Sequence, residues 1–362
     1  MVRAAIMREP NVPLEIQDFP EPDLQPGAIL LETLFSEVCG TDVHLHHGQL
    51  AGVPYPIIPG HINVGRIQRT GGAIRDVEGD VLVLGDVVTF MDVHETCNAC
   101  WFCLVAKATT RCPHRKVYGI TYSARDGLLG GWSEAIYLKP GVKVVKLPAS
   151  IPPERFIGGG CGLPTAVHAT QQAAIQLGDS VVVQGSGPVG LSAAILAQLS
   201  GACQVIVVGA PQLRLDMALE MGADAVINIE EHSPEDRTVL VKELTGGRGA
   251  DITIEASGNP QAIAEGMRMT RDNGRYVVVG QYTDAGEVKI NPHWDINRKQ
   301  LDIRGTWGID FGHFYRAVKV LAKHGARYPW EKLISQSYSL DQVNQALADV
   351  ASLKVIKAVI KP

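Results

Sequence analysis

Near the middle of the chain, short apolar runs alternate with amphipathic segments, and this order limits the possible fold more than any other feature. The runs that indicate buried strands lie at 181–184, 204–209, 225–228, 251–258 and 275–280. Segments with helical spacing fill the intervals at 188–201, 212–223, 235–246 and 260–274, and another precedes the first strand at 165–178. Strands that alternate with helices build a parallel sheet with helices on both faces. We therefore predict an α/β fold class with a doubly wound domain in this part of the chain.

The turn after the first of these strands, 185-GSGPVG-190, fits the dinucleotide-binding pattern G-x-G-x-x-G. In this pattern Gly185 permits the tight turn, Gly187 lets a pyrophosphate approach the backbone, and Gly190 lets the helix pack on the strand. The following helix opens at Pro188 and Val189, and its N-terminal N–H groups and dipole favour phosphate. The alternative is a purely structural strand-to-helix turn that binds no ligand. The position of the glycine-rich turn between a strand and a helix favours a bound nucleotide.

The choice between NAD and NADP is open at this stage. A residue at the end of the second strand reads the adenosine ribose in such folds, and a carboxylate there selects NAD. Gly209 stands at that position, so we expect room for a 2′-phosphate, and Arg214 follows five residues later.

Residues 1 to about 150 have a different pattern, in which short apolar runs at 28–35, 81–90 and 142–148 are separated by Pro and Gly. Many short strands with frequent breaks predict a barrel-like or sandwich-like β domain. Beyond residue 305 the sequence predicts helices at 313–325 and 340–352 and a closing strand at 355–360.

Length and charge exclude several classes of protein. A chain of 362 residues is long enough for about two domains. With 33 Lys and Arg against 38 Asp and Glu, it has no basic excess for a nucleic-acid partner. No apolar run approaches the roughly 18 residues of a membrane span, and the N-terminus shows no signal peptide. We expect a cytoplasmic protein with neither membrane nor nucleic acid as partner.

Four of the seven cysteines form a tight cluster with the spacing C-x2-C-x2-C-x8-C. Four thiolates this close suit a tetrahedral zinc ion whose ligand positions are all filled, which makes the site structural. An iron–sulfur cluster or free thiols are the alternatives, since the compact spacing also occurs in ferredoxins. The cluster consists of Cys97, Cys100, Cys103 and Cys112.

Three scattered residues, Cys39, His61 and Cys161, have the composition of a Cys2His zinc site with one open position, as a catalytic zinc requires. From spacing alone this is a weak indication, because a lone Cys is usually a small buried apolar residue. Cys203, which stands just before a predicted strand, is interpreted in that way.

Together these pieces resemble the zinc-dependent, alcohol dehydrogenase-like members of the medium-chain dehydrogenase/reductase superfamily, over essentially the whole chain. The segments that carry the resemblance are 39-CGTDVH-44, 59-PGH-61, the cysteine cluster, 160-GCG-162, 185-GSGPVG-190, 222-GADAVIN-228 and 355-VIKAVI-360. The resemblance implies a GroES-like catalytic domain at 1–160, a Rossmann domain for NAD or NADP at 161–305, and a return segment to the catalytic domain at 306–362.

The resemblance also assigns roles to residues. Cys39, His61 and Cys161 match the catalytic zinc ligands, and the cysteine cluster matches the structural zinc, so two zinc ions per chain are expected. Thr41 and His44 match a proton relay, and Asp42 matches the partner that orients the ligand histidine. The chain departs from the family pattern at three places. Ile62 stands where a Glu usually follows the ligand His, and eight residues precede the last cluster cysteine where seven are usual. Gly209 replaces the acidic residue that usually binds the ribose. Polyol and threonine dehydrogenases often have Glu at the position of Cys161, which favours an alcohol dehydrogenase-type site.

The function that follows is reversible hydride transfer between a primary or secondary alcohol and NAD(P)+, giving an aldehyde or ketone. Two alternatives are a zinc-free enoyl or quinone reductase of the same superfamily and a non-catalytic nucleotide-binding protein. The three zinc ligands disfavour the reductase, whereas Ile62 favours the non-catalytic protein. By resemblance we expect a homodimer or homotetramer.

Overall fold

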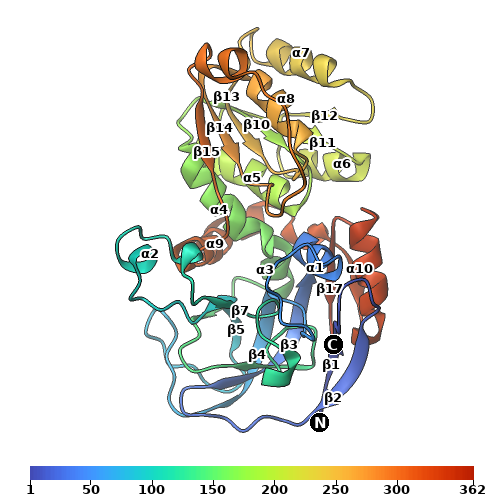
Figure 1. The fold of residues 1–362 in the computed structure, drawn as a ribbon. Coiled ribbons are helices and arrows are strands. Elements are labelled where there is room, and N and C mark those ends of the chain that lie inside the picture. The colour runs from blue at the N-terminus through green and yellow to red at the C-terminus, as the bar shows by residue number, and fades with distance from the viewer. The chain divides into compact units, whose positions relative to one another are not determined.

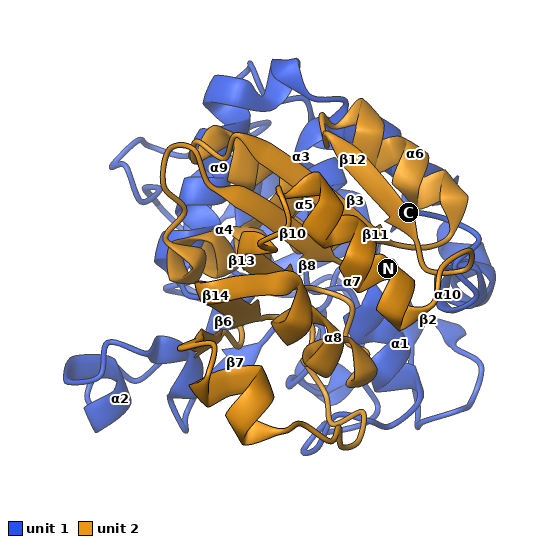
Figure 2. Cartoon of the chain, turned by 90° about the horizontal axis from the view of Figure 1, so that it is seen from above, with its two compact units in different colours: residues 1–160, 310–362 blue, residues 161–309 orange.

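A computed structural model describes all 362 residues, which form two compact units (Figure 2). Unit 1 comprises residues 1–160 and 310–362, and unit 2 comprises residues 161–309. The sequence predicts domain boundaries after residues 160 and 305, and the two units divide after residues 160 and 309.

Unit 2 is built on a six-stranded parallel sheet with the order β12-β11-β10-β13-β14-β15 (Figure 1). Its strands are β10 (Ser180–Gln184), β11 (Gln204–Gly209), β12 (Ala225–Asn228), β13 (Ala250–Glu255), β14 (Thr270–Val278) and β15 (Asp302–Gly305). The order reverses between β10 and β13, and ligands of such sheets bind outside the carboxyl ends of the strands at that reversal. The glycine-rich turn follows β10, so it lies at this place.

Helices cover the sheet of unit 2, as the alternating sequence pattern predicts. They are α4 (Gly162–Ala173), α5 (Pro188–Leu199), α6 (Gln212–Glu220), α7 (Pro234–Leu244) and α8 (Gln261–Met269), with a π-helical turn at Pro292–Asn297. Val181, Val182 and Val183 are completely buried in the central strand, because a parallel sheet with helices around it exposes neither face. This confirms the predicted α/β fold class.

Unit 1 contains a mainly antiparallel sheet with the order β16-β17-β3-β4-β5-β9, and β8 also pairs with β3. These strands are β3 (Ile29–Val38), β4 (Asn63–Thr70), β5 (Val87–Phe90), β8 (Ala135–Leu138), β9 (Val144–Lys146), β16 (Ile334–Tyr338) and β17 (Lys357–Ile360). Two smaller sheets pair β1 (Val2–Ile6) with β2 (Glu15–Phe19) and β6 (Val93–His94) with β7 (Lys116–Val117). Because β17 pairs with β3, residues 357–360 belong to the same sheet as residues 29–38.

Helices of unit 1 are mostly short. They are α1 (Gly40–His46), α2 (Trp101–Leu104), α3 (Pro153–Gly159), α9 (Phe311–His324) and α10 (Val343–Ala351). Single 3₁₀ turns occur at Thr109–Arg111, Ala124–Asp126, Gly325–Arg327, Trp330–Leu333 and Leu340–Gln342. None of the helices in the structure combines the length and the hydropathy that a membrane span requires.

Two sequence predictions about elements are wrong in part. The run 81–90 is a strand only at Val87–Phe90, because Gly85 takes a φ of +87° and Val83 and Leu84 lie exposed in the preceding loop. The helix predicted at 260–274 ends at Met269, since the chain from Thr270 onward already pairs with β13.

Candidate active site and structural metal centre

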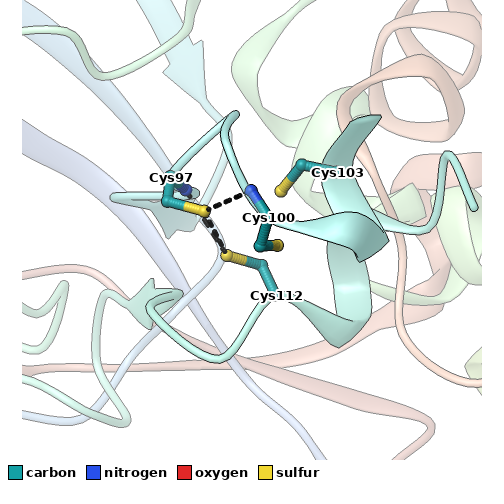
Figure 3. A group of neighbouring side chains, drawn as sticks. All are labelled: Cys97, Cys100, Cys103 and Cys112. Carbon is teal, nitrogen blue, oxygen red and sulfur yellow. Dashed lines mark hydrogen bonds between the residues drawn. The ribbon is translucent and has the colours of Figure 1, made fainter. Parts of the chain in front are cut away.

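The four cluster cysteines converge on one point (Figure 3). All four Sγ atoms lie within 4.8 Å of one another, and those of Cys97 and Cys112 are 3.6 Å apart. In a tetrahedral zinc site with Zn–S bonds near 2.3 Å, neighbouring sulfurs are about 3.8 Å apart. Hydrogen bonds from the backbone, with that of Ala99 the largest, lower the pKa of the Cys97 thiol to about 6. The donor set and the sulfur spacing therefore fit zinc, while 3.6 Å is far too long for a disulfide.

The lobe that carries these cysteines has almost no apolar interior. From residue 95 to residue 116 the only buried side chains are those of Cys103 and Cys112. Trp101, at 62% exposure, and Val105, at 63%, face solvent instead of packing inside the lobe. The fold of this segment therefore depends on what its cysteines bind.

The three scattered ligand candidates also come together. Cys39 directly follows β3 and is the N-cap of α1. His61 stands two residues before the start of β4, and Cys161 directly follows the first segment of unit 1. Their Sγ and imidazole nitrogen atoms lie within 4.8 Å of one another, and Cys39 Sγ is 3.8 Å from His61 Nε2. Tetrahedral bonding to one zinc ion would place such an S–N pair about 3.6 Å apart. Two thiols and an imidazole on one point fit a zinc ion with one position left for substrate.

Asp42 connects two of these ligands. Its Oδ2 accepts a hydrogen bond of 2.9 Å from the backbone N–H of Cys39, and its Oδ1 lies 3.9 Å from His61 Nδ1. Both Oδ1 and Nδ1 are buried without a hydrogen-bond partner. Burial opposes the charged imidazolium, but the neighbouring Cys39 and Asp42 outweigh it and raise the pKa of His61 well above its usual value. The carboxylate of Asp42 therefore faces Nδ1 of His61, while Nε2 of the same ring faces Cys39 Sγ.

The segment that follows Cys39 forms the short helix α1, as a relay through Thr41 and His44 requires. Thr41 lies in its first turn and His44 one turn later, and both are half-buried. His44 Nδ1 contacts the side-chain oxygen of Gln49. A helix brings residues three apart onto one side, so Thr41 and His44 share one side of α1.

The glycine-rich turn has the geometry that its pattern requires. Gly185 takes a φ of +106°, and a Cβ there would lie 2.7 Å from the carbonyl oxygen of Ala256. A Cβ on Gly190 would overlap the carbonyl oxygen of Gly185, so the helix can approach the turn only without a side chain. The nearest atom to a Cβ on Gly187 is an Arg214 guanidinium nitrogen at 3.9 Å, which leaves this backbone accessible to a phosphate.

Gly209 packs against the glycine-rich turn, and the expectation that it leaves room for a 2′-phosphate stays a prediction. A Cβ on Gly209 would lie 2.6 Å from Ser186 Oγ and 2.9 Å from Ser186 N, so Ser186 already fills that space. Ser186 is buried and donates a hydrogen bond of 2.9 Å to the carbonyl oxygen of Ala210. Gly209 is therefore glycine because the turn packs on it, and the cationic group near the turn is Arg214.

Glu255 and Glu37 are among the buried carboxylates that the sequence did not reveal. Glu255, at the end of β13, accepts hydrogen bonds from the backbone N–H groups of Ser257, Gly258 and Gly280 and so ties together the loops after β13 and β14. Glu37 forms an ion pair with Lys357 in unit 1. A charged residue within each of the apolar runs 29-ILLETLFSEV-38 and 355-VIKAVI-360 was the available signal.

Comparison with known proteins matches two stretches of the chain to dehydrogenase family models. Residues 25–149 match the family model of the alcohol dehydrogenase GroES-like domain, and residues 188–323 match that of the zinc-binding dehydrogenases. The chain is 35% identical over 360 residues to 5-exo-hydroxycamphor dehydrogenase of Pseudomonas putida, covering 99% of this chain and 98% of that protein. It is 29% identical to L-threonine 3-dehydrogenase of Pyrococcus horikoshii, covering 98% and 97%.

Among solved structures, an alcohol dehydrogenase from Thermotoga maritima matches with a TM-score of 0.94 and 34% identity over 100% of this chain and 99% of that one. A zinc-binding dehydrogenase from Sinorhizobium meliloti, solved with NADP bound, matches in fold with a TM-score of 0.86 at 24% identity, covering 100% and 99%.

Proposed function

Because this chain belongs to the zinc-dependent, alcohol dehydrogenase-like family of the medium-chain dehydrogenase/reductase superfamily, we propose that it oxidises a secondary alcohol to a ketone, with NADP as the preferred coenzyme. The observation that carries the proposal is the convergence of Cys39, His61 and Cys161 within 4.8 Å. These three donors would hold the catalytic zinc, and the four cluster cysteines would hold a structural zinc. The chemistry of both donor sets supports zinc in preference to a hard cation such as Mg²⁺.

Zinc at the three-ligand site would supply Lewis acidity, which lowers the pKa of an alcohol hydroxyl toward neutrality. Asp42 supports this role by holding the imidazole of His61 in the orientation in which Nε2 faces the metal. A nicotinamide coenzyme at the glycine-rich turn would accept the hydride, and the turn's backbone N–H groups would bind its pyrophosphate.

The chain's own residues have to remove the hydroxyl proton. Thr41 follows ligand Cys39 by two residues, so its hydroxyl is placed to accept the proton from the alcohol. One helical turn later, His44 can pass that proton to water, since imidazole exchanges protons readily near neutral pH.

Arg214 is the residue on which the coenzyme preference rests. No carboxylate stands at Gly209, Ala210 or Pro211 to repel a 2′-phosphate. The guanidinium of Arg214 lies beside Gly187, at the turn where the adenosine half of a dinucleotide binds. Arginine binds phosphate through charge-assisted hydrogen bonds, and this supports NADP.

We therefore expect Arg214→Gln to raise the KM for NADP about 10- to 100-fold, because it removes a charged hydrogen bond worth roughly 1.5–3 kcal/mol. The KM for NAD, which lacks the 2′-phosphate, should change by less than about threefold. Steady-state kinetics with both coenzymes measure this. An equal rise in the KM for both coenzymes would show that Arg214 only supports the fold of the turn.

The alcohol class is proposed from the relatives. The hydroxyl groups of 5-exo-hydroxycamphor and of C3 of L-threonine are both secondary, although the two molecules otherwise differ. A panel of secondary and primary alcohols, each with NAD and NADP, tests the proposal. We expect the highest kcat/KM with a secondary alcohol and NADP; activity confined to primary alcohols would overturn the substrate proposal. We also propose that the enzyme is a cytoplasmic homodimer or homotetramer, which sedimentation of the purified protein tests for its oligomeric state.

A further inference from the structure

Glu37 and Lys357 form an ion pair inside unit 1. Each residue is only 1% exposed, and Lys357 Nζ donates a hydrogen bond to Glu37 Oε1. They lie on β3 and β17 and are 320 residues apart in sequence. Burying two charges costs several kcal/mol per ion, and apolar residues of the same volume are often at least as stable. General stability is therefore a weak reason for this pair to be present.

The surroundings of Glu37 give a better reason, because the residue contacts the neighbours of all three proposed zinc ligands. Glu37 is the last residue but one of β3, and Cys39 directly follows the end of that strand. Its backbone N–H donates a hydrogen bond of 3.0 Å to the carbonyl oxygen of Ile62, which follows His61. A Cβ on Gly160, which precedes Cys161, would overlap both Glu37 Oε2 and Lys357 Nζ.

The contact with Gly160 explains why this position is glycine. Gly160 ends helix α3 with a φ of +47°, and the ion pair occupies the space where a side chain would lie. The backbone before Cys161 is therefore packed directly on the carboxylate and the ammonium group. Movement of either charged group would move the start of the segment that carries Cys161.

We propose that the Glu37–Lys357 ion pair positions the three ligand-bearing segments around the catalytic zinc. Glu37 is a positioning residue in this account, and the inference rests on the proposed zinc site. A charge-assisted hydrogen bond is suited to the task, because it fixes distance and direction more strictly than apolar packing does.

Two variants separate this role from a contribution to stability. Glu37→Gln removes the charge of one partner, and the double variant Glu37→Met/Lys357→Met replaces the pair by apolar side chains without leaving a lone buried charge. Glu265→Gln is the matched control, because it breaks the Arg237–Glu265 pair of unit 2, whose side chains are each 11% exposed. The readouts are the rate of zinc transfer to a chelator and the thiolate-to-metal absorption of the cobalt-substituted protein.

If the pair positions the ligands, both Glu37→Gln and the double variant should lose the more labile zinc about 10- to 100-fold faster than wild type, the usual effect of changing a residue that supports metal ligands. Their cobalt absorption should shift, whereas Glu265→Gln should behave as wild type in both measurements. Wild-type release and absorption in the double variant would overturn the inference, as would equal acceleration in Glu265→Gln. A wild-type protein that binds only one zinc would instead overturn the proposed zinc site.

Discussion

Thr41→Ala is expected to lower turnover by about 10²–10⁴-fold, the usual contribution of a positioned acid–base group, while both zinc ions stay bound. In the proposed relay, the hydroxyl of Thr41 is the group that accepts the proton from the alcohol. Because Thr41 lies in the first turn of α1 and is not a metal ligand, its loss should leave the zinc content unchanged. Steady-state kinetics together with metal analysis of the purified variant measure both effects.

Two further variants serve as controls for this result. Thr41→Ser keeps the hydroxyl and should retain most of the activity. His44→Ala should cost less than Thr41→Ala and be rescued by added buffer base, because water or buffer can replace the outer imidazole. If Thr41→Ala kept full activity with its zinc in place, the relay would be ruled out.

Loss of the structural zinc should strongly destabilise the segment that carries the four cluster cysteines. Cys103→Ser is expected to lose one zinc per chain and to unfold the lobe at residues 95–116. Cys103 and Cys112 are the only buried side chains in that segment, so no apolar core remains to hold it without metal. Structural zinc in small peptides contributes roughly 10–16 kcal/mol of binding free energy, which here would stabilise the lobe.

Limited trypsin digestion reports the state of the lobe, since Lys107, Arg111 and Arg115 lie within it. Cleavage at these residues should be rapid in Cys103→Ser and slow in wild type. Cys203→Ser is the matched control, because Cys203 is exposed and lies outside both metal centres. The interpretation of Cys203 as a small buried residue is therefore wrong. A Cys103→Ser protein with two zinc ions and wild-type resistance to trypsin would contradict the assignment.

Local patterns predicted unit 2 well because its elements are set by nearby residues. Strands β11 and β12 have the bounds that their apolar runs indicate, and Gly185 and Gly190 have the backbone roles that the pattern predicts. Strand-to-helix alternation repeats over short distances, so periodicity alone was sufficient there. In unit 1 the loop at 81–86 was mistaken for strand, since an exposed apolar loop has the same composition as a buried strand.

The features that sequence did not predict depend on contacts between distant segments. Ser186 fills the space beside Gly209 because β10 and β11 lie next to each other, and no local pattern reveals that packing. Glu37 and Lys357 meet only because β17 pairs with β3. The cysteine cluster was predicted from its spacing, whereas Cys39, His61 and Cys161 were proposed as ligands mainly through family resemblance, since their spacing along the chain carries little information about their distance in space.

Zinc content and turnover, measured in wild type and in Cys161→Ala, test whether Cys39, His61 and Cys161 hold a catalytic zinc. Wild type should contain two zinc ions per chain and should reduce the coenzyme in the presence of an alcohol. Cys161→Ala should contain one zinc, held by the cysteine cluster, and should show no measurable turnover. A metal-replete wild type with a single zinc, or a Cys161→Ala variant that keeps both zinc ions and full turnover, would refute a catalytic zinc at these three residues.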